Sequence, residues 1–190
     1  MSINAKPGYL SYISPSQINL QVPDDVATGT INVVVMNSTG SVTAPVVLAP
    51  ISPSFLIWDN AEHVTAYIPT PNGTGAYGAG AYDLLGPFGA FAFSTRPVKG
   101  GETLCLYGVG FGPTSPAVPA GKGFLGAVPT TYAVTVTIGG VPANVLFAGI
   151  AEAGLYQINV IVPNTGTGDK AIQATVNAVR TQAGSVVTVQ

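Results

Sequence analysis

The side chains best suited to chemistry surround the only histidine, His63. A metal site or a Ser–His or Cys–His pair would have to include it together with other groups. Glu62 is adjacent in sequence, but neighbours along a strand point to opposite faces. Asp59 could approach His63 across a turn, which would allow a weak hydrolytic or metal site. The sequence offers no nucleophile beside a base, so we expect no enzymatic activity.

Two further acidic residues, Asp24 and Asp25, stand together at an expected turn, and Asp169 occupies a similar place later in the chain. Calcium uses carboxylate-rich turns but takes about 6–8 oxygen ligands. Adjacent aspartates without further acids more often cap a turn. Asp24 and Asp25 are therefore a weak calcium candidate, and we expect no bound metal or cofactor.

One glycine-rich segment has the residue spacing of a nucleotide-binding motif but not its structural context. Gly73, Gly75 and Gly78 have the spacing of the dinucleotide fingerprint. That fingerprint needs a strand before it and a helix after it, so that the helix N-terminus can hold a pyrophosphate. Pro71 precedes these glycines and more glycine follows them. We interpret the segment as a loop.

Aromatic side chains concentrate in the segment 53–96, which holds eight of the 16 aromatic residues. Sugar-binding surfaces use exposed Trp and Tyr rings, which combine a flat apolar face with a polar tip. The candidate platform consists of Trp58, Tyr67, Tyr77 and Tyr82. The alternative is that Phe55, Trp58 and Phe91 fill a junction between two modules while the tyrosines cover the base of the loop, since aromatic residues supply much of the packing energy of a core.

The elements that position these residues are expected to be strands. Sixteen Pro and 24 Gly leave little room for helices. Short alternating runs separated by turn residues indicate an antiparallel sandwich. The expected strands are 17–22, 30–36, 42–48, 103–107, 133–138, 143–147, 155–162, 171–176 and 185–189, with weaker signals at 55–58 and 63–68. Gly139 and Gly140 are expected to form a two-residue hairpin turn.

A duplication organises the chain. The segment 17–23 (QINLQVP) recurs as 157–163 (QINVIVP), and 2–8 precedes the first copy as 137–143 precedes the second. Repeated strand segments in a fixed order indicate two related modules. The alternation predicts that one face points inward and that Asn19 and Asn159 face outward or bond to turns. The inward residues are Ile18, Leu20 and Val22 in the first copy and Ile158, Val160 and Val162 in the second.

Composition excludes several classes of partner. Only 7% of residues are charged and the net charge is -2, so nucleic acid is not expected as a partner. No apolar run reaches the roughly 20 residues of a membrane-spanning helix, so membrane insertion is not expected either. Cys105 stands alone in an apolar run and is expected to be a small buried hydrophobe.

Three motifs resemble the IPT/TIG-like immunoglobulin modules of large bacterial secreted or surface proteins of unknown function. They are 103–113 (TLCLYGVGFGP), 136–143 (VTIGGVPA) and 154–163 (GLYQINVIVP). The resemblance implies two immunoglobulin-like β-sandwich modules in tandem, an extracellular or cell-surface location and no catalytic residues. It covers 97–190 as a complete module and 1–52 as a partial one, with 53–96 as a connector.

The first module lacks a counterpart of the segment 101–113. Either it is truncated, or the segment 55–67 or another chain fills the gap. We expect the chain to be a piece of a longer array, whose signal peptide would lie upstream. An incomplete module exposes sheet edges, which recruit other strands and could produce a dimer.

The expected function is therefore that of a non-catalytic spacer, display or anchoring unit, with neighbouring modules of a parent protein as its partners. The alternative is a carbohydrate-binding or adhesion module that binds polysaccharide through the aromatic residues of the connector.

Overall fold

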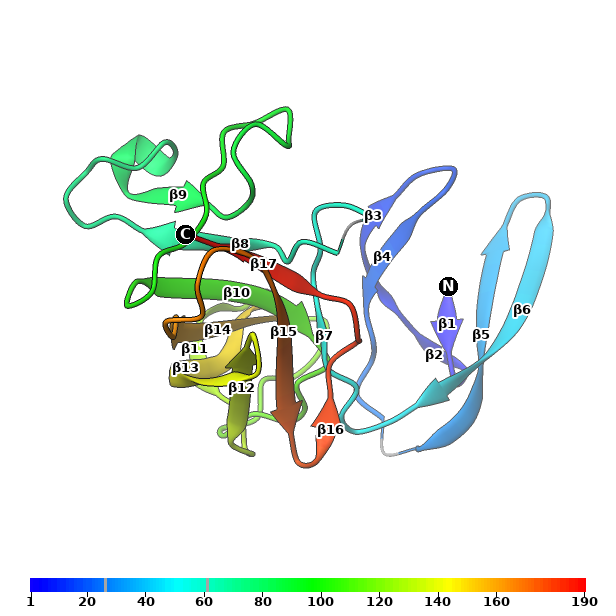
Figure 1. The fold of residues 1–190 in the computed structure, drawn as a ribbon. Helices are drawn as coiled ribbons and strands as arrows, with labels where there is room; N and C mark the ends of the chain where they lie inside the picture. Colours follow the sequence, from blue (N-terminus) through cyan, green and yellow to red (C-terminus); the bar gives the residue numbers. More distant parts are fainter. Residues whose placement is uncertain (26, 61) are drawn as a thin grey trace.

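The protein consists of antiparallel β-strands in a computed structural model that describes residues 1–25, 27–60 and 62–190 (Figure 1). Residue 26 of the expected range 1–52 and residue 61 of the range 53–96 lie outside the described residues. Within the described part, the one helical element is a 3-10 turn, η1 (Gly78–Gly80). The all-β prediction is confirmed, and the large antiparallel sheets are consistent with a β-sandwich. The described residues contain no helix of the length and apolarity that crossing a membrane requires.

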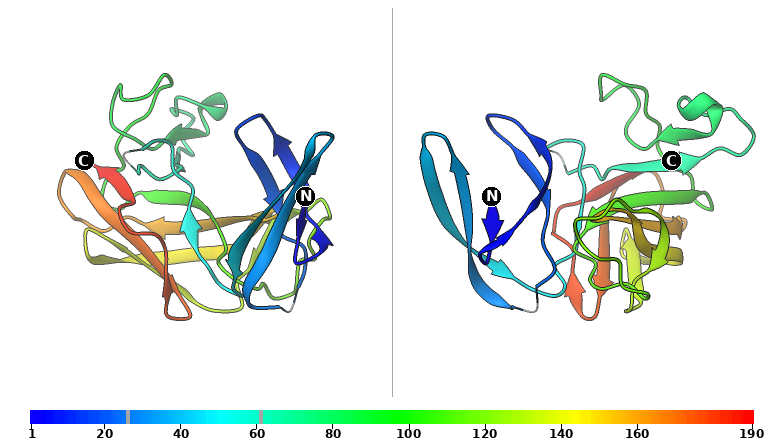
Figure 2. Two further views of the ribbon diagram at one scale, coloured as in Figure 1. Left: turned by 90° about the vertical axis from the view of Figure 1, so that its right-hand side faces the viewer. Right: turned by 180° about the vertical axis from the view of Figure 1, so that it is seen from behind.

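The N-terminal region holds two separate small sheets. One sheet has the order β2-β1-β5-β6, and the other is the hairpin β3-β4. Figure 2 shows both hairpins, β3–β4 and β5–β6, standing beside the larger body of the protein. The bounds are β1 (Ser2–Ile3), β2 (Lys6–Pro7), β3 (Tyr9–Ile13), β4 (Ile18–Gln21), β5 (Gly29–Asn37) and β6 (Gly40–Leu48).

The rest of the chain forms one 11-stranded sheet with the order β16-β15-β12-β13-β14-β10-β8-β9, to which β11, β17 and β7 are added on β13, β15 and β10. The bounds are β7 (Ser54–Phe55), β8 (Ala66–Pro69), β9 (Tyr82–Leu84), β10 (Thr103–Val109), β11 (Leu125–Pro129), β12 (Val134–Ile138), β13 (Val141–Glu152), β14 (Leu155–Ile161), β15 (Gly168–Val176), β16 (Val179–Arg180) and β17 (Val186–Val189). Each of the nine expected strands overlaps one of the observed strands.

The larger sheet folds around the core because the long strand β13 belongs to two parts of it. One part contains β12 and β15, and the other contains β14 and β10. The first residues of β13, Val141–Ala143, pair with β12, and the part from Asn144 onward pairs with β14. Apolar residues of β12, β15 and β17 thereby share one buried cluster with those of β8, β10 and β14. Leu104, Leu106 and Phe111 are among its fully buried members.

The segment 53–96 belongs to this larger sheet. β7 pairs with Gly108 and Val109 of β10, and β8 pairs with Cys105 and Leu106 of the same strand. The segment therefore does not fill the gap in the N-terminal region. One of the three alternatives derived from the sequence, completion by 55–67, is wrong, because these residues already have β10 as their partner.

The duplicated sequences adopt the same pairing pattern twice. β1 pairs with β2 through a two-residue turn and with β5 on its other side, as β12 does with β13 and β15. Both turns have positive φ at both positions, at Asn4 and Ala5 in the first copy and at Gly139 and Gly140 in the second. The predicted glycine turn is confirmed.

The hairpin that follows in each copy, β3–β4 and β13–β14, has the same irregularity in its register. In β3–β4 the register shifts between the pairs Leu10↔Leu20 and Tyr12↔Asn19. In β13–β14 it shifts between Val145↔Val160 and Phe147↔Asn159, the equivalent positions. A bulge bends a strand and is a specific feature of its pairing. The two regions therefore share strand order, turn type and bulge position.

The prediction of inward-facing residues holds for one copy and fails for the other. Ile158, Val160 and Val162 are at most 1% exposed. Ile18 and Leu20 are only half-buried, and Val22 is 44% exposed, so the prediction for the first copy is wrong. The reason is that β14 lies between β13 and β10 inside the core, whereas β3 is the only strand partner of β4 among the described residues.

Candidate functional site

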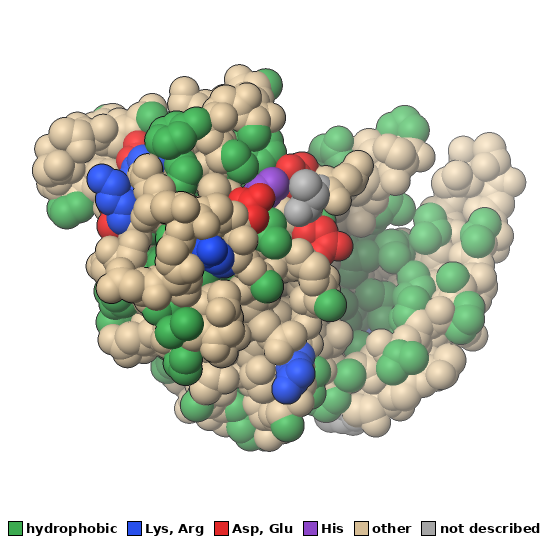
Figure 3. All heavy atoms as spheres, in the orientation of Figure 1, with side chains coloured by type: hydrophobic (Ala, Val, Ile, Leu, Met, Phe, Trp, Pro, Cys, Tyr) green, Lys and Arg blue, Asp and Glu red, His purple; other side chains and the backbone are tan. Residues whose placement is uncertain are grey.

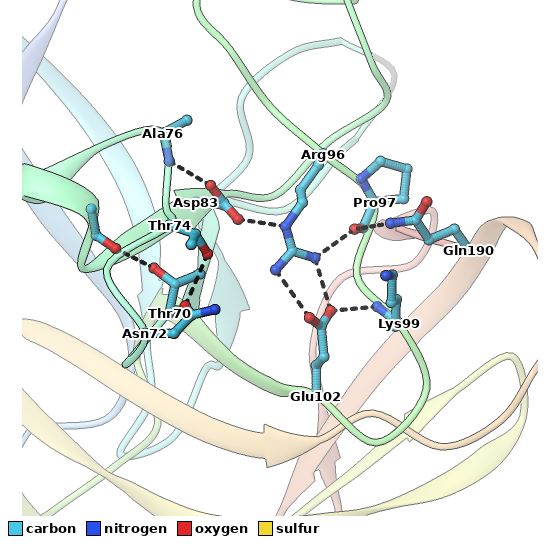
Figure 4. Close-up of polar contacts among 11 residues, drawn as sticks. Thr70, Asn72, Thr74, Ala76, Asp83, Arg96, Pro97, Lys99, Glu102 and Gln190 are labelled. Carbon is cyan, nitrogen blue, oxygen red and sulfur yellow. Dashed lines mark hydrogen bonds and ion pairs between the residues drawn. The ribbon is translucent and has the colours of Figure 1, made fainter.

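A cleft lies between two loops of the aromatic segment, residues 69–82 and 86–95. Its volume is about 1110 Å³. Uncharged polar side chains line one side, including Thr70, Asn72 and Thr74, and the rings of Phe88, Phe91 and Phe93 line the other. Phe88 is 68% exposed. Figure 4 shows the polar groups at the base of the cleft converging on Arg96.

Arg96 joins both loops to the larger sheet through two carboxylates. Its Nε donates to Oδ2 of Asp83 on β9 at 2.5 Å. Its Nη1 and Nη2 donate to the two oxygens of Glu102 at 2.8 and 3.0 Å. This paired geometry is the strongest way in which a guanidinium binds a carboxylate. The cation is therefore fully occupied by protein groups.

The electrostatics of this cluster favour the charged forms of both acids. Burial acts to raise the pKa of the Asp83 carboxyl, but the hydrogen bonds from Arg96 and from the Ala76 N–H outweigh it and hold the pKa below its usual value. The same balance lowers the pKa of Glu102, where Arg96 and the Lys99 N–H donate. The cluster is thus a neutralised ionic support beneath the loops, which leaves hydrogen-bonding and aromatic groups to contact a ligand.

The glycines of the first loop are required by close packing. A Cβ at Gly75 would lie 2.4 Å from Oγ1 of Thr70 and from the Tyr82 carbonyl oxygen. One at Gly80, where φ is +90°, would lie 2.2 Å from the Gly73 carbonyl oxygen. Thr70 donates its hydroxyl to the Gly80 carbonyl at 2.5 Å. The glycines fold the loop upon itself, in agreement with its interpretation as a loop.

Three of the four aromatic residues singled out from the sequence lie in two ring clusters rather than on one platform. Tyr67 packs against Tyr82 and Tyr107, with ring centres 5.4 and 5.9 Å apart. Trp58 packs against Phe93 at 5.2 Å. All four are half-buried.

The remaining candidate, Tyr77, connects the two loops of the cleft. Its hydroxyl oxygen accepts a 2.7 Å hydrogen bond from the Ser94 N–H. Because none of Trp58, Tyr67, Tyr77 and Tyr82 lines the cleft, the ring surface open to a ligand is that of the phenylalanines, Phe88 above all. The cleft lies within the segment that the sequence singled out, and the rings that line it are those of phenylalanines.

His63 lies between two carboxylates. Its Nδ1 is 2.9 Å from Oδ2 of Asp59, as the spacing suggested, and its Nε2 is 3.5 Å from Oδ2 of Asp169. Figure 3 shows the histidine in purple with acidic side chains on both sides. The residue is only 8% exposed, and its ring lies perpendicular to that of Phe91, with the ring centres 5.9 Å apart. This histidine ties the start of the aromatic segment to β15.

The calcium candidates Asp24 and Asp25 take part in other contacts. Oδ2 of Asp25 accepts a 2.8 Å hydrogen bond from the Asn4 side chain, and its Oδ1 is 3.2 Å from the Lys6 ammonium. The Asn4 hydrogen bond is the main reason why the pKa of Asp25 is lowered to about 2. Oδ2 of Asp24 accepts from the Ala120 N–H at 3.1 Å. Among the described residues, no three His, Cys, Asp or Glu side chains gather as a metal site would require.

Cys105 is buried in β10, as expected for a small hydrophobe. Burial raises the pKa of its thiol. A thiol must ionise to act as a nucleophile, so this environment disfavours its reactivity.

Sequence reasoning did not identify Arg96, Asp83 and Glu102 as a cluster. The signal available was their rarity, because the chain has only six Lys and Arg and eight Asp and Glu. A charge retained in such a chain, within an apolar segment, calls for a partner. No periodicity connects the three residues, since they lie on loops and strand ends.

No family model, curated protein or solved structure matches the chain.

Proposed function

We propose that the protein is a non-catalytic, extracellular structural unit that spaces, displays or anchors other parts of a bacterial surface or secreted protein. It would do so as two immunoglobulin-like modules of the IPT/TIG type in tandem, the first of them incomplete. The observation that carries the proposal is the repeated strand pairing, which includes the hairpin turn and the bulge. Repeated sandwich modules stack into extended supports.

The character of the polar residues agrees with this role. His63 is buried between Asp59 and Asp169, and Arg96 is occupied by Asp83 and Glu102. A reacting group must be able to reach its substrate, and these groups are occupied within the protein. The low share of charged residues, 7%, makes contacts with neighbouring modules insensitive to salt.

A spacer must hold a fixed distance, and this can be measured. Spin labels would be placed at Ser38→Cys, in the β5–β6 turn, and at Thr167→Cys, before β15, in a Cys105→Ala background. We expect one narrow distance distribution between the labels, unchanged by added polysaccharides or calcium. A broad distribution, or one that moves on addition of a small molecule, would contradict a rigid structural role.

Carbohydrate binding is a second candidate, favoured by one observation. The cleft between the two loops combines a largely exposed ring, Phe88, with threonine and asparagine side chains. Sugars bind where an aromatic face meets convergent hydrogen-bonding groups.

Its test is titration of the protein with a panel of polysaccharides, read by calorimetry. If a sugar binds in the cleft, Phe88→Ala weakens binding about tenfold, the equivalent of about 1.4 kcal/mol. The matched control is Leu125→Ala, which removes a similarly exposed apolar side chain on β11, 86% exposed. Equal binding by both variants would exclude the cleft.

A further inference from the structure

The first loop of the cleft carries a pair of residues with a characteristic covalent chemistry. Asn72 and Gly73 form the one Asn-Gly pair in the sequence. An asparagine in such a pair loses its side-chain amide when the next backbone nitrogen attacks Cγ, because glycine has no Cβ to obstruct the five-membered ring that forms. Both residues are exposed, and Asn72 also lines the cleft. The reacting atoms are therefore open to water at the edge of the candidate site.

The backbone at Gly73 is unobstructed. Its φ is +74°, in the region that favours glycine, and a Cβ at this position would meet no atom within 4 Å. The Gly73 N–H donates to the Thr70 carbonyl oxygen at 3.0 Å, and this bond must open before the nitrogen can attack. Single turn bonds in surface loops open far more readily than those of a core. The bond therefore slows the attack in the folded protein without preventing it.

Thr74 provides an activating contact. Its hydroxyl donates to Oδ1 of Asn72 at 2.9 Å (Figure 4). Negative charge develops on this oxygen when a nitrogen attacks Cγ, and a donor already placed at that oxygen stabilises the charge. The hydroxyl of Thr74 is therefore positioned to speed the loss of the Asn72 amide.

Asn37 provides a comparison within the same chain. Thr39 donates its hydroxyl to Oδ1 of Asn37 at 2.7 Å, so the contact with the residue two positions on is repeated. The same oxygen also accepts from the N–H groups of Thr39 and Gly40 at 2.9 and 3.1 Å, which fixes the side chain in its turn. The next residue is Ser38, which has a Cβ. The two sites share the hydroxyl donor and differ in the obstruction to ring closure.

We propose that Asn72 is a site of spontaneous deamidation, activated by Thr74, which places a carboxylate on the polar side of the cleft. The Gly73 nitrogen loses its proton to water and bonds to Cγ of Asn72. The Cγ–Nδ2 bond breaks, and ammonia leaves with a proton taken from water. A water molecule then opens the cyclic imide at either carbonyl, which gives aspartate or isoaspartate. Water is the only co-reactant, and the inference depends neither on the spacer role nor on sugar binding.

Either product changes the cleft. Arg96 is already occupied by Asp83 and Glu102, so it does not neutralise the new carboxylate. Isoaspartate also adds a carbon to the backbone of a closely packed loop, in which a Cβ at Gly80 would lie 2.2 Å from the Gly73 carbonyl oxygen. Deamidation therefore alters both the charge and the shape of the first loop.

The test is incubation of the purified full-length protein, followed by peptide mapping that separates asparagine, aspartate and isoaspartate. We expect conversion at Asn72 about tenfold faster than at Asn37, because the Cβ of Ser38 hinders ring closure. The rate should rise with pH, because the backbone nitrogen must lose its proton. The denatured protein, mapped in parallel, should convert faster at Asn72, because the bond to the Thr70 carbonyl is absent.

Substitutions separate the activating contact from the loop as a whole. Thr74→Val removes the hydroxyl, keeps the shape of the side chain and should slow conversion about threefold, the effect of one exposed hydrogen bond. Thr74→Ser retains the hydroxyl and should restore the rate. Thr39→Val is the matched control and should leave the rate at Asn72 unchanged. Asn72→Gln should abolish conversion at this position, because a longer side chain does not close a five-membered ring.

Three results would overturn the proposal. They are an unchanged Asn72 in the folded protein when the denatured protein converts, equal rates at Asn72 and Asn37, and a rate in Thr74→Val that matches or exceeds the rate in Thr74→Ser. The first would show that the turn bond protects the site. The last would show that the hydroxyl does not activate the amide.

Discussion

Gln17 donates its side-chain amide to Oδ1 of Asn19 at 2.7 Å, and Gln157 makes the same bond to Asn159 at 2.8 Å in the second copy. The bond runs along one face of a strand, between residues two positions apart. Asn19 is exposed and Asn159 is half-buried. The same interaction is therefore present in two different environments of one molecule.

These two hydrogen bonds should contribute different amounts to the free energy of unfolding, because they differ in burial. Asn159→Ala should lower the free energy of unfolding by about 1 kcal/mol, because it removes a partly desolvated hydrogen bond. Asn19→Ala should cost less than about 0.5 kcal/mol, because water replaces the lost partner. Urea denaturation of both variants measures the two values. Equal losses would mean that the two strands share one environment.

The ionic support of the cleft predicts a reversal of pH dependence. Arg96→Met leaves Asp83 and Glu102, with side chains 13% and 30% exposed, without their cation. Removing one partner of a largely buried ion pair should cost about 2–4 kcal/mol at pH 7. In the native protein both acids have lowered pKa values, so their contribution to stability is lost as the pH falls through those values.

In the Arg96→Met variant burial raises the pKa of these acids instead, and stability should increase as the pH falls from 7 to 5. Urea denaturation at both pH values measures this. Arg180→Met is the control, because Arg180 is exposed on β16, and it should change stability by less than about 0.5 kcal/mol. The same pH slope in both variants would show that Arg96 does not support the two carboxylates.

The Asp25 carboxyl predicts a second pH effect, in the N-terminal region. Its pKa is lowered from 3.8 to about 2, chiefly by the Asn4 side chain. Its contribution to stability is present above about pH 4 and is lost as the pH falls toward 2. In Asn4→Ala the pKa should move back toward 3.8, as measured by carboxyl carbon NMR. Asn37→Ala, at the end of β5, should leave the titration of Asp25 unaltered.

Substitution of a buried and of an exposed phenylalanine should have very different effects on stability. Phe111 is fully buried against Phe55 and Tyr156, with ring centres 6.0 and 5.9 Å apart. Phe111→Ala should therefore cost about 3–5 kcal/mol. Phe88→Ala should change stability by less than about 0.5 kcal/mol, because the ring is 68% exposed. Thermal unfolding compares the two, and a large loss for Phe88 would indicate that this ring supports the loops.

Local patterns were enough to place most strands. Alternation in 17–22 and 155–162 and the paired glycines at 139–140 led to β4, β14 and the β12–β13 turn, all of which the structure contains. β1 and β2 were not among the predicted strands, because each has only two residues and their turn, Asn4–Ala5, contains no glycine. A periodic signal needs about four residues or more.

Long-range relationships could not be predicted in the same way. Nothing local indicates that β7 and β8 pair with β10, or that Arg96 joins residues 13 and 6 positions away. The half-exposure of Leu20 and Ile18 likewise does not follow from their own sequence, because it reflects that β4 has β3 as its one strand partner within the described residues. Periodicity indicates which face is apolar, whereas burial depends on what covers that face.

The position of the core along the chain has an evolutionary consequence. The main cluster begins at Ile51 and includes Phe55, Val64, Ile68 and Leu85 as well as the residues of the second repeat. Recombination near codon 50 would therefore exchange the first region as a cassette and leave the remaining core whole. Recombination near codon 97 would sever β7 and β8 from β10. Gene shuffling that preserves folding should accordingly favour the earlier junction.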